Sequence, residues 1–172
     1  ERAEEPDPGQ ALMFFHLSRQ AGSGFTVQLE AGCQELARFD IGPDERIEFL
    51  GDPVFRDRGA LPRSILGTDG LVDADKLFDH VPGHYYWFHW RDGALECGSS
   101  FCGILPVFHR YVNGWTDISS SAFCIARAHG LIADDRGYLL ERRLFNYPLF
   151  DRTPWTSIRL LPAHSKLVAD AD

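Results

Sequence analysis

The sequence predicts an α+β domain built mainly from antiparallel strands. Residues 81–121 contain four short strand-like runs separated by three turns: residues 84–90, 94–98, 106–112 and 116–121. Asp92-Gly93 and Asn113-Gly114 lie between the first two and the last two runs, and both dipeptides are strong hairpin signals because their residues tolerate positive φ. We therefore expect the four runs to form an antiparallel meander.

Within the first run, aromatic side chains alternate on both faces of the expected strand. Tyr85 and Trp87 lie on one face, and Tyr86, Phe88 and Trp90 lie on the other, because successive side chains of a strand point to opposite sides. Both faces need an apolar cover. A strand between a second sheet and a helical layer would have that cover, whereas an exposed strand would not.

Further strands and helices are expected on both sides of this meander. The other strand-like segments are residues 11–18, 25–30 and 46–51. The helical segments are residues 73–81, 122–129 and 136–147. Residues 52–70 are rich in Pro, Gly and Arg and are expected to form a surface connection.

Length and composition indicate one ordinary globular domain. The chain has 172 residues, of which 44% are hydrophobic, and we expect a flexible acidic tail at residues 1–10 and a folded body at residues 11–168. The net charge of -8, without a Lys/Arg cluster, argues against a nucleic-acid partner. No apolar run approaches the roughly 20 residues that span a bilayer, so no membrane association is expected. Four cysteines without a CxxC pair indicate reduced thiols and a cytoplasmic protein.

Four short motifs follow one another from residue 81 onward. They are Val81-Pro82-Gly83-His84-Tyr85, residues 99–108 with Gly103 and Pro106, Ile118-Ser119-Ser120-Ser121, and residues 153–164 with Thr153, Ile158, Leu161 and Pro162. In this order and spacing they resemble the amino-terminal, glutaminase-like domain of the asparagine synthetase family, a class II glutamine amidotransferase domain. The resemblance implies a four-layer αββα sandwich of antiparallel sheets, as in the amino-terminal-nucleophile hydrolases.

The residues that would hydrolyse glutamine in that family have no counterparts in this chain. The family uses an amino-terminal cysteine whose free α-amino group activates the thiol. Here the strand-like run at residues 11–17 stands in its place without a cysteine, and Ser99-Ser100 stand where the family has Arg-Asp. We therefore expect no catalytic residue, as in β-lactam synthetases and lasso-peptide cyclases, which resemble the family but have lost this cysteine.

The resemblance implies a non-catalytic scaffold of an ATP-dependent amide or lactam ligase of the natural-product or peptide-cyclising type. The partner of this scaffold would be a synthetase domain in the same or a separate chain. The scaffold would bind either that domain or a peptide or small-molecule substrate. Tyr85, Trp87 and Trp115 are candidates for the docking surface. ATP and Mg²⁺ are expected only in the synthetase domain, whose Ser-Gly-Gly-x-Asp-Ser loop is not among these residues. No cofactor is expected here.

Other interpretations of the residues remain open. The chain can be the glutamine-hydrolysing domain of a true asparagine synthetase whose amino-terminal Cys is missing from this sequence, or a stand-alone interaction protein. His80, His84 and His89 do not form a recognised metal-ligand set, and we expect them to be satisfied core or surface histidines. A thiol hydrolase built from Cys97 or Cys102 with His109 is less expected than small buried thiols.

Overall fold

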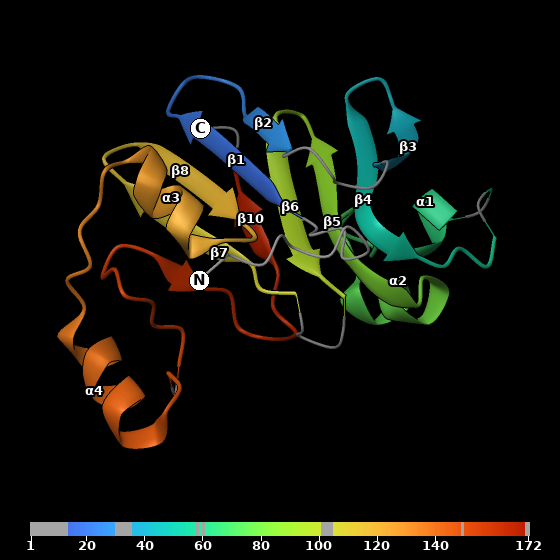
Figure 1. Cartoon of the computed structure of the whole chain (residues 1–172). Helices are drawn as coiled ribbons and strands as arrows, with labels where there is room; N and C mark the ends of the chain where they lie inside the picture. Colours follow the sequence, from blue (N-terminus) through green and yellow to red (C-terminus); the bar gives the residue numbers. More distant parts are fainter. Residues whose placement is uncertain are drawn as a thin grey trace, which may run out of the picture.

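The computed structural model describes residues 14–29, 36–57, 59, 61–100, 105–148 and 150–170. Within them the chain forms two antiparallel sheets of five strands each, together with helices (Figure 1). The first, called the β1 sheet, has the order β2 (Thr26–Leu29), β1 (Phe15–Gln20), β8 (Trp115–Ser119), β7 (Phe108–Val112) and β9 (Arg159–Leu160). The second, called the β5 sheet, has the order β10 (Leu167–Ala169), β6 (Ala94–Ser99), β5 (Gly83–Arg91), β4 (Glu45–Pro53) and β3 (Ala37–Gly42). The α+β class and the antiparallel sheets are confirmed.

The four strands predicted within residues 81–121 exist, but they do not form one meander. β5 pairs with β6 in the β5 sheet, and β7 pairs with β8 in the β1 sheet. Asp92 and Asn113 have φ values of 50° and 53°, so both hairpin turns are built as predicted. The two hairpins lie in different sheets because β10 occupies the free edge of β6 and β1 occupies the free edge of β8.

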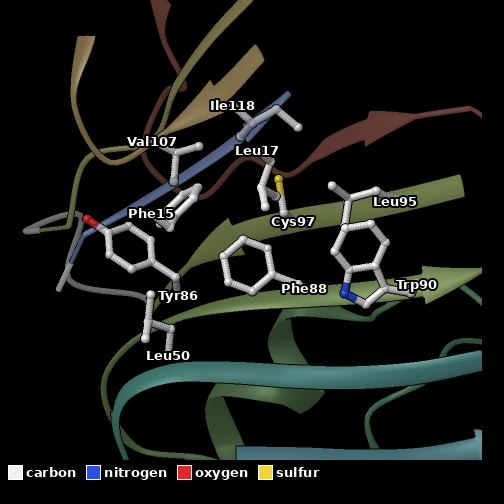
Figure 2. Packing of buried hydrophobic residues seen from close by; sticks show 10 residues of the cluster. All are labelled: Phe15, Leu17, Leu50, Tyr86, Phe88, Trp90, Leu95, Cys97, Val107 and Ile118. Carbon is white, nitrogen blue, oxygen red and sulfur yellow. The ribbon is translucent and has the colours of Figure 1, made fainter. Parts of the chain in front are cut away.

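An apolar core fills the space between the two sheets (Figure 2). Phe15 of β1 is buried against Tyr86 and Phe88 of β5, with ring centroids 4.8 Å and 5.0 Å apart and the rings edge to face. This geometry is the favourable one for aromatic pairs. The other buried members of this core are Leu17, Leu50, Trp90, Leu95, Cys97, Val107 and Ile118.

A second core lies on the other face of the β5 sheet. Tyr85 and Trp87 pack there against apolar side chains of α1 (Leu61–Ser64) and α2 (Ala74–His80). Both faces of β5 are therefore covered, as its aromatic alternation predicts. The prediction that residues 52–70 form only a surface connection is wrong, because Leu61 and Ile65, four residues apart, point the same way from one helical turn into this core.

The outer face of the β1 sheet carries the helix α3 (Ala122–Ala128). Ile125 and Ala126 are buried there beside Ile158 of the C-terminal segment. The order through the molecule is thus α1 and α2, the β5 sheet, the β1 sheet and α3 (Figure 1). The last helix, α4 (Arg136–Phe145), stands away from both sheets and has no buried residue (Figure 1).

The predicted helices 73–81, 122–129 and 136–147 are confirmed by α2, α3 and α4. Asp73 caps α2 by accepting a hydrogen bond from the Lys76 amide, and Asp135 caps α4 by accepting one from the Tyr138 amide. α4 ends at Asn146, whose φ of 64° is left-handed, two residues before Pro148. Within the described part of the chain, no helix is long and apolar enough to cross a membrane.

Candidate functional site

The resemblance would place the catalytic cysteine at the beginning of the run 11–17. Residues 11–13 of that run lie outside the described residues, and the strand β1 begins at Phe15. Its backbone amide donates to Ser120 Oγ (3.1 Å), and its carbonyl accepts from Ser119 Oγ (2.7 Å) and from the Ser120 amide (3.2 Å). The Phe15 nitrogen belongs to a peptide bond and is not basic, so it cannot activate a nucleophile as a free α-amine does. Ser119 and Ser120 therefore hold the strand in place, and Ser121 begins α3 as its N-cap residue.

The described cysteines do not supply a nucleophile at this position. Cys97 is buried in the core between the sheets, and burial, together with the neighbouring charge of Glu96, raises the pKa of its thiol to about 12. A thiol held protonated by burial is a poor nucleophile at neutral pH, which argues against the alternative that pairs Cys97 with His109. Cys124 lies on α3 and is half-buried. Cys33 and Cys102 lie outside the described residues.

Ser100, where the resemblance has an aspartate, is bonded to the neighbouring strand β5. Its amide donates to the Tyr85 carbonyl (2.8 Å), its hydroxyl lies 3.5 Å from the Tyr85 amide, and the residue is buried. Gly83, one of the motif glycines, has a φ of 126°, and a Cβ there would come within 2.1 Å of the Asp52 carbonyl oxygen. Only glycine fits at that position. Gly103 lies outside the described residues.

The closing motif, residues 153–164, forms a compact turn that joins β7. Thr153 Oγ1 lies 2.8 Å from the Ile158 carbonyl oxygen and 3.0 Å from the Trp155 carbonyl oxygen, and either can accept its hydrogen bond. The Leu161 amide donates to the Val107 carbonyl (2.7 Å), next to Pro106 of the second motif. Pro162 follows directly. The structure thus brings the second and the last motif side by side, although about 50 residues separate them.

These two motifs line a groove, which is the candidate site. Two adjoining hollows of about 540 Å³ each share Ser99, His164 and Ser165. One hollow is mainly apolar and is lined by residues that include Leu105, Pro106, Phe150, Leu161 and Pro162. The other carries charged side chains, namely Asp69, Asp73, Lys76 and Lys166. Each hollow has the size of a small-molecule site, so the groove can bind a ligand that has one apolar and one charged part.

His164 sits at the junction of the two hollows with a left-handed backbone. Its φ is 62°, a conformation that glycine adopts easily and that costs energy for a residue with a Cβ. The family motif that the closing segment resembles ends in glycine at this position. The backbone of the turn is therefore the one that a glycine motif would have, with a histidine side chain added at the groove.

The predicted docking residues do not form one surface. Tyr85 and Trp87 are fully buried, with at most 2% of their surface exposed. Neither residue forms an exposed surface, because β5 is an inner strand covered on both faces, although Trp87 lines the charged hollow of the groove. Trp115 is 37% exposed at the start of β8 and beside His129 of α3, so it stays a candidate.

The histidines predicted to be core or surface residues fall into those two groups. His80 and His84 are exposed. His89 is buried, with Nε2 3.0 Å from Glu45 and Nδ1 3.4 Å from Glu96. Burial alone would raise the pKa of the Glu96 carboxyl, but the hydrogen bonds from His89 and the Val72 amide and the charge of Lys166 outweigh it and lower that pKa. Among the residues that the structure describes, no group of three His, Cys, Asp or Glu side chains is arranged to hold a metal ion.

Sequence reasoning missed a buried ionic cluster under α3. Asp117 of β8, fully buried, accepts hydrogen bonds from His129 (2.8 Å), His16 (3.3 Å) and Arg110 (3.3 Å). Burial alone would raise the pKa of the Asp117 carboxyl, but the hydrogen bonds and charges of His16 and His129 lower it. The four residues come from β1, β7, β8 and the end of α3, so no local spacing in the sequence marks them as a group.

Comparison with known proteins adds no family assignment. No protein-family model matches the chain, and no curated protein matches it.

Proposed function

We propose that this chain is a non-catalytic, glutaminase-like domain that serves an ATP-dependent, amide- or lactam-forming ligase related to asparagine synthetase. Its fold would be the four-layer αββα sandwich of amino-terminal-nucleophile hydrolases. Two facing antiparallel sheets with helices outside each are the arrangement that this proposal requires. Gly83 and the glycine-like backbone of His164 support it further, because both lie in motifs that carry the resemblance.

The observation that carries the loss of catalysis is the start of β1. Phe15 lies in the run 11–17 where the resemblance would begin with the nucleophile, its nitrogen is an amide bonded to Ser120, and its side chain fills the core between the sheets. Ser100, in place of an aspartate, bonds the neighbouring strand. A glutamine molecule would find neither a nucleophile nor the charged residue at these places. This favours a degenerate domain over the hydrolysing domain of a true asparagine synthetase.

The role that remains for such a domain is to hold a partner or substrate at the groove between the second and the last motif. Its apolar part suits the side chains of a peptide or the hydrocarbon part of a metabolite. Its charged part, with Lys76 and Lys166 close to Asp69 and Asp73, suits a polar end group. Activation of a carboxylate by ATP and Mg²⁺ would take place in the synthetase domain, and the cell compartment would be the cytoplasm.

The first test is glutamine hydrolysis. The purified protein is incubated with glutamine, and glutamate is measured, with an active class II glutaminase as the positive control. No glutamate above the enzyme-free blank is expected. Steady glutamate release in proportion to the amount of this protein would contradict the proposal, because it would show a working glutaminase.

The second test concerns the ligase. We expect the coding sequence downstream of Asp172, or a neighbouring gene, to encode a Ser-Gly-Gly-x-Asp-Ser loop. The chain is then combined with that synthetase, ATP and Mg²⁺, and amide formation on the synthetase's substrate is followed by mass spectrometry. Ala163→Trp fills the groove from an exposed position and should slow the reaction, whereas Ala133→Trp, exposed before α4, should not. Equal rates for both variants would exclude the groove as the docking site.

A further inference from the structure

Arg19 of β1 is a buried cation without a hydrogen-bonding partner in the described part of the chain. Only 7% of its surface is exposed. Its guanidinium carbon lies 4.7 Å from the centre of the Phe25 ring, and it makes no hydrogen bond or ion pair with any described residue. The cation–π contact covers one face of the guanidinium but leaves its five N–H donors unused.

The donors of Arg19 open into a pocket at the edge of the space between the sheets. The side-chain nitrogens of Arg19 make no hydrogen bond to the described residues, yet they are not completely shielded from solvent. Arg19 lines a hollow of about 340 Å³ between the inner face of the β1 sheet and the edge strand β10. Because burying an unbonded charge is costly, a guanidinium at this depth calls for an acceptor in the pocket.

The other polar groups of the pocket wall are suited to donate as well. Thr116 of β8 lies directly opposite Arg19 in the sheet, and Tyr111 of β7 lies opposite Thr116, so the three residues form a row on the inner face. His109 lies on the same face. Burial and the charge of Arg159 lower its pKa, and the charge of Asp151 only partly offsets them. A neutral His109 offers one N–H at neutral pH.

The opposite wall and the rim restrict what can enter. Leu167, Val168 and Ala169 of β10 form the opposite wall, and the exposed Asp170 lies at the rim. The volume is at the lower limit of ligand sites and fits a small molecule of about amino-acid size.

We propose that this pocket binds a small ligand through an oxyanion group, a carboxylate or a phosphate, that accepts two hydrogen bonds from the guanidinium of Arg19. Arginine binds both groups in this two-pronged way, with Thr116 and His109 as further donors. The pocket is separate from the groove, because the two share no lining residue. The proposal does not depend on the glutaminase-like assignment.

The test is a titration of the full chain by NMR or calorimetry at constant ionic strength. The probes are inorganic phosphate and succinate, which distinguish a phosphate site from a carboxylate site, and sodium chloride is the control salt. We expect saturable binding of at least one probe, with the largest amide shifts in β1 and β8. Arg19→Gln should weaken binding by roughly tenfold or more, and Arg19→Lys, which keeps the charge but not the fork, by less.

Arg127→Gln is the matched control, because Arg127 is an exposed arginine on α3, outside this pocket. It should leave the affinity unchanged. An equal loss in Arg127→Gln and Arg19→Gln would show general charge attraction and overturn the proposal, as would the absence of saturation with both probes. If Arg19→Gln does not fold, Thr116→Val provides the second variant, and it should weaken binding roughly threefold by removing one donor. Unchanged affinity in a folded Thr116→Val would count against the site.

Discussion

The sheets and α4 differ in how their apolar side chains are used. Between the sheets, Phe15, Tyr86 and Phe88 are buried and pack edge to face. On α4, by contrast, the leucines 139, 140 and 144 are all more than half exposed. Both α2 and α4 start at an aspartate cap, but only α2 places a leucine, Leu77, in a core. The comparison teaches that local signals start a helix, whereas burial decides how much its side chains stabilise the fold.

The largest effect is expected from a substitution between the sheets. Phe88→Ala removes a ring that packs against Phe15 and leaves a cavity, so the free energy of unfolding should fall by about 3–5 kcal/mol. Urea denaturation followed by tryptophan fluorescence measures it. A loss below about 1 kcal/mol would mean that the two sheets do not share a tight core.

Asp117→Asn should have the next largest effect. The substitution removes the negative partner of Arg110, His16 and His129. Breaking a buried ion pair lowers the free energy of unfolding by about 3–5 kcal/mol. We expect a loss near the lower limit here, because part of the cluster reaches solvent. Urea unfolding of the variant measures this loss. His84→Asn, an exposed histidine, is the control and should change little.

The same cluster predicts how stability depends on pH. The folded-state pKa of Asp117 lies below its ordinary value, so the stabilisation is present above the unfolded-state pKa of about 4 and is lost as the pH falls through the lower, folded value. Unfolding measured from pH 7 down to acid should therefore show a drop below about pH 4 that is smaller in Asp117→Asn. A variant with the same acid profile as the natural chain would show that other carboxyls dominate.

The two aspartate caps allow a matched comparison of α2 and α4. Asp73→Ala should lower the global free energy of unfolding by about 1 kcal/mol, because α2 contributes Leu77 to a core. Asp135→Ala also removes an ion pair with Arg152, yet it should mainly increase local opening of α4. Hydrogen exchange resolves the two outcomes. Equal global losses would show that α4 unfolds together with the sheets.

The smallest effect is expected on the exposed face of α4. Leu144→Ser changes a side chain that packs on no core, so the free energy of unfolding should change by no more than about 0.5 kcal/mol. The same urea experiment measures it. A loss comparable to that of Phe88→Ala would mean that α4 is covered in solution, which would remove the contrast between the two regions.

The sequence predicted the features that depend on neighbours along the chain. The hairpin turns at Asp92-Gly93 and Asn113-Gly114, the caps at Asp73 and Asp135 and the two apolar faces of β5 are all present. Two errors are local, namely the helical turn α1 and the strand β3, which pairs with the neighbouring β4. The other errors concern partners that are distant along the chain. The two hairpins were expected in one sheet but lie in different sheets. The strands β9 and β10 have only two and three residues, so their patterns are too short to identify before the sheets are known.

At the candidate site, some of the predicted fold-motif residues line the groove, but the groove itself was not predicted. Pro106, Leu161 and Pro162 line one hollow, whereas Thr153, Ser119 and Ser120 proved to be backbone supports. Two of the three predicted docking residues are buried, because an aromatic strand looks the same in sequence whether one face or both are covered.

By itself, the sequence determined the local elements of this protein, since turn geometry, caps and side-chain alternation depend on residues a few positions apart. Only the tertiary structure decided which hairpin joins which sheet, that Asp117 gathers His16, Arg110 and His129, and that Arg19 is buried beside a pocket. These depend on strand pairing between residues up to a hundred positions apart, and local physical chemistry does not encode that choice.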